Sequence, residues 1–346
     1  MQAVIGKQYL IFNKTAGTGA IPDPRDARDL PYAEVAMGAA PVDWGKGYDV
    51  EGEIGDTLKI KNQDGSSSCV GQGWAYQIAV LDTVENGFYN EVSAKVFYSQ
   101  IHLAGGGAYV RDGAKLAVNF GALSEMLVPS YDNGKPPSES FMTKKDWMSP
   151  ELSALAQKLQ AKEYRKAENS MDMIAKAIRD NHGCVGGVMG ENNGTWKTFE
   201  PKPPKNGGEW GHCIYFGKFG VDKLGKFIST PNSWGSRGED QLHQDGWQKL
   251  REDYFNDKHM FNPWTLVDKP NFAMSPETQK LMIQHEKHLI MEGEGVGRKG
   301  IIVDGLLRQI LDPTNNRAAA ACLYLSPVKF TVTSKIFNEM LKGDNF

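Results

Sequence analysis

Apolar residues at helical spacing predict the first long helix of the chain. Four large side chains recur at intervals of three and four residues and so share one helix face; they are Val70, Trp74, Ile78 and Leu81. Serine hydroxyls around Ser67 are available as N-caps, and Gly87 is a residue type that commonly follows a helix end. We expect the helix to begin just after Ser67 and to end before Gly87.

Similar patterns predict further elements downstream. Helices are expected at 94–101, 112–120 and 171–181, the last of them capped by Ser170. Alternating or continuous apolar runs predict strands at 58–61, 184–189, 212–220 and 226–230. The last two are expected to pair as a hairpin across a Lys/Gly turn. Residues 133–150, rich in Pro, Ser and Lys, are expected to form a surface connection.

The two ends of the chain differ from its middle. Residues 1–38 include a loop with Pro22 and Pro24 that cannot propagate a helix, and we interpret them as an arm or short leader. A main domain is expected over 39–270, followed by an extension of unknown role over 271–346. The elements predicted in the extension are a charged helix at 276–291, a hairpin at 300–311 that turns at Asp304-Gly305, and short helices at 315–325 and 334–342.

Composition and charge argue against several classes of function. The 346 residues carry a formal net charge of -3 with no large block of one sign. This balance argues against nucleic acid or an anionic membrane as a partner and favours small molecules or polypeptides. No apolar stretch approaches the about 20 residues that span a bilayer, and no secretory signal is evident. We therefore expect a soluble chain, cytoplasmic or associated with a virion or another assembly.

The candidate metal and phosphate motifs are weak. None of the four cysteines lies in a CxxC pair, and His285 and His288 lie in a polar, helical pattern that we interpret as surface, so we expect no metal and no cofactor. The segment Gly293–Gly297 superficially resembles a phosphate loop. Because no predicted strand precedes it and no Gly-Lys-Ser/Thr follows it, we interpret it as a linker.

Three separated motifs carry candidate chemistry. Cys69 lies where a loop becomes a helix, and the helix dipole and the free N–H groups there favour a thiolate. His212 begins an apolar strand in the motif Trp-Gly-His-Cys, and Asn232 lies in the motif Asn-Ser-Trp-Gly. Taken singly, a buried structural cysteine, a core histidine and a turn asparagine explain these residues at least as well.

The order and the neighbours of these residues resemble the papain and cathepsin family of cysteine peptidases. In that family a glutamine precedes the nucleophile by six residues, as Gln63 precedes Cys69 here. Further stretches similar to the family's motifs lie at 41–44, 105–107, 121–125, 129–131 and 245–247. The resemblance covers roughly 41–255 and does not include the C-terminal extension.

The resemblance implies a fold and a mechanism. The fold would be α+β and two-lobed, with a helical lobe, a lobe built on an antiparallel β-barrel, and a small C-terminal α+β extension. Cys69 would attack the scissile carbonyl of a polypeptide from a thiolate and imidazolium pair with His212, and Asn232 would orient the imidazole. The other implied site residues are Gln63 at the oxyanion, Gly106 and Gly107 along the substrate backbone, Trp210 at a side-chain pocket and Trp234 over the His–Asn bond.

Two departures from the family pattern leave the reacting groups in place. Ser66 replaces a disulfide cysteine and Val70 replaces an aromatic residue, although Trp74 can fill part of the aromatic's space. Asn232 also lies farther from Cys69 than the about 130–150 residues that are typical. The Lys/Gly turn that precedes Asn232 can absorb this extra length.

Other functions stay open at this point. An inactive relative could keep the fold as a binding surface, although it would usually lose its Cys or His first. Another cysteine acyl-transfer enzyme, such as a cell-wall amidase or a transglutaminase-like protein, would typically orient its histidine with an aspartate rather than with Asn232. The extension 271–346 could bind a protein partner or pack on the catalytic domain, and we expect it to be dispensable for the chemistry.

Overall fold

The fold comes from a computed structural model in which the chain forms two compact units, residues 1–268 and 269–346. The described residues of the first unit are 9–11, 14–16, 19–36, 40–56, 58–63, 65–87, 89–132, 134–235 and 246–267, and those of the second are its four strands. Of the described helices, none has the length and apolar character that a bilayer crossing requires.

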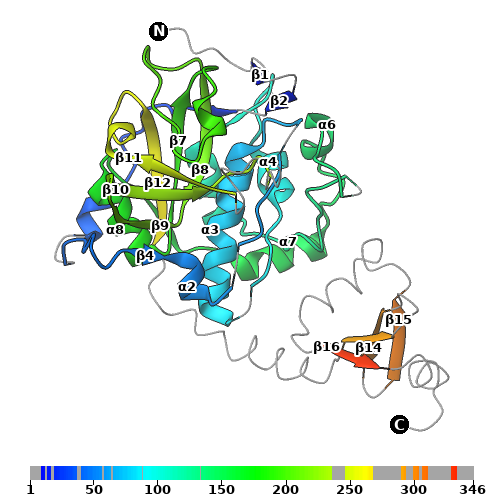
Figure 1. The fold of residues 1–346 in the computed structure, drawn as a ribbon. Helices are drawn as coiled ribbons and strands as arrows, with labels where there is room; N and C mark the ends of the chain where they lie inside the picture. The colour runs from blue at the N-terminus through cyan, green and yellow to red at the C-terminus, as the bar shows by residue number, and fades with distance from the viewer. Residues whose placement is uncertain are drawn as a thin grey trace. The chain divides into compact units, whose positions relative to one another are not determined.

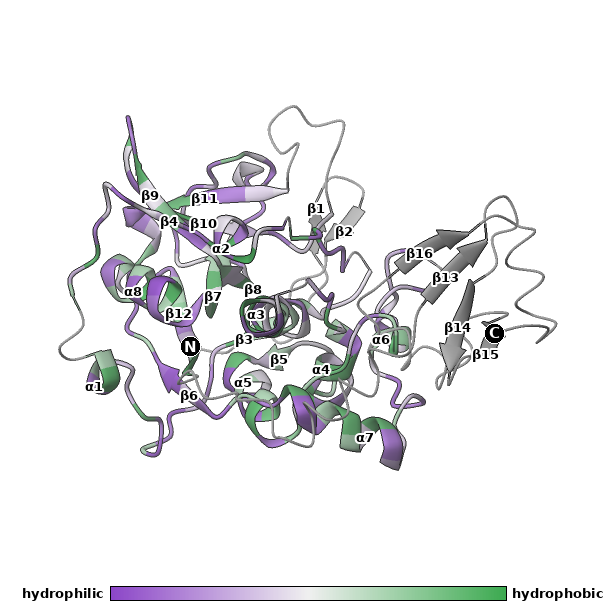
Figure 2. Cartoon of the chain, turned by 90° about the horizontal axis from the view of Figure 1, so that it is seen from below, coloured by the Kyte–Doolittle hydropathy of each residue, from purple (hydrophilic) through white to green (hydrophobic). Residues whose placement is uncertain are grey.

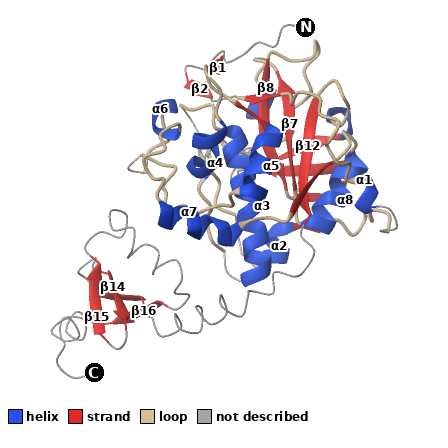
Figure 3. Cartoon of the chain, turned by 180° about the vertical axis from the view of Figure 1, so that it is seen from behind, coloured by secondary structure: helices blue, strands red, loops and turns tan. Residues whose placement is uncertain are grey.

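Most helices of the first unit gather on one side and the strands on the other, while α1 (Ala33–Ala36) and α8 (Met171–Asn181) lie beyond the strands (Figure 3). The helical side contains α3 (Cys69–Asn86), α4 (Ala94–Ile101), α5 (Val110–Asn119), α6 (Glu139–Met142) and α7 (Pro150–Ala156). The predictions for α3 and α4 are confirmed. Helix α5 starts earlier than predicted because Val110 and Arg111 are buried and take part in its first turn.

The N-terminus of α3 is not capped as predicted. Ser68 occupies the N-cap position, but its side chain makes no capping bond. Its Oγ lies 2.8 Å from Ser66 Oγ and accepts a hydrogen bond from Gln72 Nε2 at 3.1 Å. At the other end Gly87 has a left-handed φ of 76° and donates its N–H to Thr83 O, as expected of a glycine that ends a helix.

Helix α3 is buried on nearly all sides rather than along one face. In Figure 2 it is seen nearly end on, between the strands and helices α4 and α5. A Cβ on Gly71 would lie 2.7 Å from Ala94 O, and one on Gly73 would lie 3.1 Å from Val185 Cγ1, so glycine permits close approach on both sides. Trp74 donates to Val110 O at 2.9 Å. The helix thus joins the helical side to the sheet.

Two open four-stranded antiparallel sheets form the other side of the first unit (Figure 1). The first has the order β6-β12-β7-β8 and consists of β6 (Glu163–Lys166), β7 (Cys184–Gly190), β8 (Trp210–Phe216) and β12 (Met260–Val267). The second has the order β11-β10-β9-β4 and consists of β4 (Tyr48–Asp49), β9 (Lys218–Asp222), β10 (Gly225–Pro231) and β11 (Trp247–Arg251). The α+β class is therefore confirmed, whereas the expected barrel is not closed in the described part of the chain.

The predicted strand at 212–220 is two strands in different sheets. The break lies at Gly217, where β8 ends and β9 begins. Gly217 donates its N–H to Ser229 O at 3.1 Å and accepts from Val50 N at 3.2 Å, so it links β10 to the start of α2 (Val50–Ile54). Strands β9 and β10 form the predicted hairpin across the Lys/Gly turn, with Asp222 opposite Gly225.

The predicted strand at 58–61 is wrong. These residues form no ladder, and only Asn62 makes an isolated bridge, with Trp234. The apolar alternation is explained by burial instead. Leu58 is buried in the core, and Lys61 is fully buried, with its Nζ bound to Val92 O at 2.9 Å and to Glu91 Oε1 at 3.2 Å.

Other predictions for the first unit are mostly confirmed. Helix α8 (Met171–Asn181) has the predicted bounds, with Ser170 Oγ accepting from Met173 N at 3.3 Å. Strand β7 matches the apolar run that begins at Cys184. The connection 133–150 is only partly at the surface, because it contains α6 and buries Met142 and Trp147.

The N-terminal segment contributes short elements. Strands β1 (Tyr9–Ile11) and β2 (Lys14–Ala16) pair antiparallel. Strand β3 (Ala20–Ile21) pairs in parallel with β5 (Ala108–Tyr109). The proline-containing stretch that follows is not helical, as predicted, and a one-turn helix α1 (Ala33–Ala36) comes after it.

The second unit contains one described sheet with the order β15-β14-β13-β16. Its strands are β13 (Ile290–Gly293), β14 (Lys299–Val303), β15 (Leu306–Ile310) and β16 (Lys329–Val332). The antiparallel pair β14 and β15 confirms the predicted hairpin. The predicted helix at 276–291 cannot include Ile290, because Ile290 is the first residue of β13. Strand β13 also leads into the glycine-rich segment, before which no strand was predicted. The predicted helices at 315–325 and 334–342 lie outside the described residues.

Candidate active site

Cys69 is the first residue of α3 and is fully buried. Burial raises the pKa of its thiol to about 11, while backbone N–H groups of Cys213 and Gly19 lie against the sulfur and oppose this shift. The thiol therefore lies near the backbone of Cys213 on strand β8, the residue that follows His212. Cys69, Cys184 and Cys213 are all free and buried.

His212 is the third residue of β8 and lies opposite Val188 of β7. Its Nε2 is 3.0 Å from Asn232 Oδ1, and its Nδ1 has no hydrogen-bond partner among the described residues. Burial lowers the pKa of His212 to about 4, and the bond to Asn232 opposes this effect. Together with the raised pKa of Cys69, this favours a neutral thiol and a neutral imidazole rather than the ion pair that the resemblance implies.

Aromatic rings enclose the imidazole. Trp234 stacks on His212 with ring centroids 4.5 Å apart, and Trp196 meets it edge-on at 6.1 Å. Trp210, expected at a side-chain pocket, is buried, and its ring centroid lies 5.7 Å from that of Trp196 and 6.1 Å from that of Trp234. The cluster excludes water from the imidazole, which is the physical origin of its lowered pKa.

Gln63 is tied to the loop that carries Asn232. Its backbone N–H donates to Ser233 O at 2.8 Å, and Gly235 donates to Lys61 O at 2.9 Å. Ser233 Oγ donates to Gln63 Oε1, and Gln63 Nε2 donates to Ser66 O at 3.2 Å. The segment before Cys69 and the loop after β10 are thus held side by side.

Residues 19–21 of the N-terminal segment lie across the site. Ala108 donates to Gly19 O at 2.8 Å, and a Cβ on Gly107 would lie 2.4 Å from the same oxygen. On the other side, a Cβ on Gly211 would lie 2.3 Å from Ala20 O. The segment therefore passes between the glycines of the 105–107 loop and strand β8, with its backbone against the Cys69 sulfur.

The glycines of this loop are needed for conformation and for space. Gly106 and Gly107 have left-handed φ values of 94° and 79°, which side chains with a Cβ rarely adopt. The structure thus places His212 against Asn232, the backbone of Gln63 against Ser233, and the backbone of residues 19–21 beside Gly107 and Gly211. Trp234 lies over the imidazole, and Trp210 lies in the core behind it.

Sequence reasoning missed two residues of this site. Gln248 on β11 accepts a hydrogen bond from Asn232 Nδ2 at 2.6 Å, and Trp196 lies in the 3₁₀ turn Thr195–Lys197. The stretch 245–247 was recognised, so Gln248 adjoined a motif, but nothing local marked its side chain as part of the site. Trp196 lies in no motif at all.

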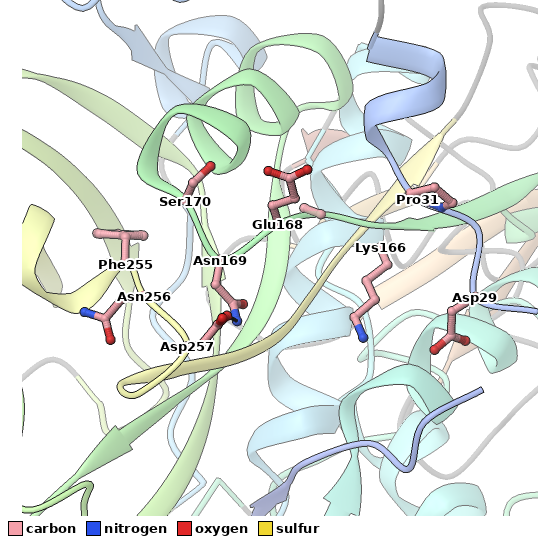
Figure 4. Close-up of a pocket in the computed structure, with 10 residues that line it drawn as sticks. Asp29, Pro31, Lys166, Glu168, Asn169, Ser170, Phe255, Asn256 and Asp257 are labelled. Atoms are coloured by element: carbon pink, nitrogen blue, oxygen red, sulfur yellow. Dashed lines mark hydrogen bonds between the residues drawn. The ribbon is translucent and has the colours of Figure 1, made fainter. Parts of the chain in front are cut away.

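A separate pocket of about 710 Å³ lies between the residues around Asp29, the stretch 166–170 before α8 and the loop 255–257 (Figure 4). Asn169 and Asp257 meet across it at 2.6 Å. None of the predicted site residues lines it. Within the described residues no cluster of His, Cys, Asp and Glu is arranged to hold a metal, and His285 and His288 lie outside those residues.

Comparisons with known proteins address the fold. No family model matches the chain, and no curated protein sequence does. Among solved structures, xylellain, a cysteine protease from Xylella fastidiosa, is similar with a TM-score of 0.59 and 20% identity over 77% of this chain and 100% of its own. Procathepsin B from Trypanosoma congolense is similar with a TM-score of 0.53 and 13% identity over 73% of this chain and 86% of its own.

This chain has a papain-like fold. A third papain-like structure, the cysteine protease and lectin-like domains of a surface-layer-associated protein of Clostridium difficile, is similar with a TM-score of 0.54 and 14% identity over 75% of this chain and 57% of its own.

Proposed function

We propose that this chain is a cysteine endopeptidase. Cys69 is the nucleophile, His212 the general base and acid, Asn232 the residue that orients the imidazole, and Gln63 a donor to the oxyanion. The observation that carries the proposal is the meeting of two separate segments. Helix α3, which begins at Cys69, packs beside strand β8, which carries His212, and the His212 ring lies 3.0 Å from Asn232 Oδ1.

The proposed reaction balances as an acyl transfer through a thioester. His212 takes the thiol proton, the Cys69 sulfur forms a bond to the substrate carbonyl carbon, and His212 then protonates the amine as the C–N bond breaks. A water molecule, deprotonated by His212, attacks the thioester and returns the thiol. The oxyanion would be received by the Cys69 N–H at the start of α3 and by the Gln63 amide.

Residues 19–21 are the proposed cover of this site. The backbone N–H of Gly19 is close enough to the Cys69 thiol to lower its pKa, and the Gly19 carbonyl oxygen accepts from Ala108 N at 2.8 Å. A polypeptide substrate would have to displace this segment, and Gly106 and Gly107 would then bind the substrate backbone.

Hydrolysis of casein and of peptidoglycan by the full chain and by Cys69→Ala tests the proposal. We expect the wild type to cleave casein, leave peptidoglycan intact, and lose casein hydrolysis in Cys69→Ala. Cys184→Ala is the matched control, because Cys184 is also free and buried but lies on β7 away from His212. Cleavage of peptidoglycan alone would favour an amidase, and casein hydrolysis that survives Cys69→Ala would refute the role of the thiol.

A further inference from the structure

The side chain of Gln248 makes three hydrogen bonds beside the candidate site, two of them buried and one partly buried. It lies on β11 opposite Thr230 of β10. Its Nε2 donates to Trp196 O at 3.0 Å and to Thr198 O at 2.9 Å. Its Oε1 accepts from Asn232 Nδ2 at 2.6 Å.

These bonds determine which way both amides point. A backbone carbonyl oxygen can only accept, so the end of the Gln248 amide that faces Trp196 O and Thr198 O must be the NH2 group. The other end is then Oε1, which can only accept. Asn232 must therefore present its NH2 group to Gln248 and its Oδ1 to His212.

The orientation of Asn232 in turn determines the tautomer of His212. Because Asn232 Oδ1 is an acceptor, the imidazole nitrogen 3.0 Å from it, Nε2, must carry the proton in the neutral ring. The remaining nitrogen, Nδ1, then has a free lone pair. It has no hydrogen-bond partner among the described residues, so it is available as a base.

We propose that Gln248 is a positioning residue that fixes the tautomer of His212 through the amide of Asn232. The bonds from Gln248 go to two backbone carbonyl oxygens, which can only accept. The donors and acceptors from Gln248 through Asn232 to His212 can therefore be arranged in only one way. If Asn232 turned over, its NH2 group would face Nε2 and stabilise the tautomer with the proton on Nδ1. That tautomer could not accept the proton of Cys69. This last consequence rests on the proposed function, whereas the tautomer does not.

Nitrogen-15 NMR of the full chain with labelled histidine tests this proposal. The seven histidines give a small set of signals, and His212 is assigned by comparison with a His212→Phe variant. At neutral pH we expect Nε2 of wild-type His212 to be the protonated nitrogen and Nδ1 the unprotonated one. In Gln248→Met, which keeps the length of the side chain but has no amide, we expect a mixture or an exchange of the two tautomers.

Two further variants separate this role from a general loss of packing. Thr230→Val changes the cross-strand neighbour of Gln248 and removes a buried hydroxyl that has no partner among the described residues, so it should leave the tautomer as in the wild type. In an Asn232→Ala background, Gln248→Met should have no further effect on His212, because the link is already cut. If Gln248→Met does not fold, Gln248→Leu takes its place.

The results decide between the alternatives. Protonation of Nδ1 in the wild type, or an unchanged Nε2–H tautomer in a folded Gln248→Met or Gln248→Leu variant, would overturn the proposal. If the wild type hydrolyses casein, we also expect Gln248→Met to lower kcat on the order of 10- to 100-fold, the size of effect seen when a metal-ligating histidine loses the partner that orients it, with little change in KM. If the wild type is inactive, the proposed function fails but the NMR result still decides the tautomer.

Discussion

Two parts of the candidate site, the side chains behind His212 and the segment 19–21, are held in different ways. On one side, His212, Asn232 and Gln248 form a buried chain of side-chain hydrogen bonds that ends on backbone carbonyls. On the other side, residues 19–21 lie over the thiol through a two-residue parallel pairing and close contacts with glycines. Orientation of the imidazole is therefore built into the fold, whereas access to the thiol depends on few contacts.

The residues that follow 19–21 bind the segment to α5 and β12 through Asp23 and Asp29. Arg111 on α5 binds Asp29 at 2.9 Å and donates its backbone N–H to Asp23 at 3.1 Å. Asp23 also accepts from Trp264 Nε1 at 2.8 Å. Because these anchors lie beyond residues 19–21, weakening the cover should leave the polar chain behind His212 unchanged.

We expect the largest loss of activity from a substitution at the proposed oxyanion site. Gln63→Ala removes a donor to the oxyanion and should lower kcat on the order of 100- to 1,000-fold. The measurement is casein or peptide hydrolysis, with Gln157→Ala, an exposed glutamine at the end of α7, as the matched control. Full activity of Gln63→Ala would show that its amide does not serve the oxyanion.

We expect a smaller effect from a substitution that displaces residues 19–21 from the Cys69 thiol. A Cβ on Gly19 would lie 2.3 Å from Ser67 O, so Gly19→Ala forces the segment away from the site. Overpacking of this kind costs about 1–3 kcal/mol, and alkylation of Cys69 should accelerate about tenfold or more. The control is Gly52→Ala in α2, where the nearest atom to a Cβ is 4.0 Å away. Equal alkylation rates in Gly19→Ala and the wild type would mean that residues 19–21 do not limit access.

The smallest effect should be the dependence of the cover on pH. Burial raises the pKa of Asp23 from 3.8 to about 6 while the segment is docked. The docked state then binds a proton more tightly than the released state, so docking strengthens as the pH falls through about 6. The ratio of Cys69 alkylation rates, wild type over Asp23→Asn, should fall by up to about tenfold from pH 7 to pH 5. Dividing by the variant removes the titration of the thiol, and a constant or rising ratio would contradict this account.

Local patterns predicted what depends on local structure. Helices α4 and α8 have the predicted bounds because their apolar periodicity and serine caps act within one segment. The order of Gln63, Cys69, His212 and Asn232 was readable because family motifs are contiguous in sequence.

The remaining features depend on contacts between distant segments. Alternation continues through Gly217, so nothing local marked the passage from one sheet to the other. Lys61 is a charged residue that is fully buried only because Glu91 and Val92 O receive it. Gln248 belongs to the site because of two carbonyls about 50 residues earlier in the chain, as the separations of 52 and 50 residues show. The position of Gly19 over the thiol likewise depends on its contact with Gly107, which lies far along the chain.

The most direct test of the central claim is the alkylation rate of each cysteine by iodoacetamide, read by peptide mapping in the Gly19→Ala variant with and without His212→Phe. We predict that Cys69 reacts at least about 100-fold faster than Cys184 when His212 is present, because general-base assistance is typically worth about 100-fold or more. The advantage should disappear in His212→Phe. Equal rates for Cys69 and Cys184, or a Cys69 rate that ignores the loss of His212, would contradict the pairing of thiol and imidazole.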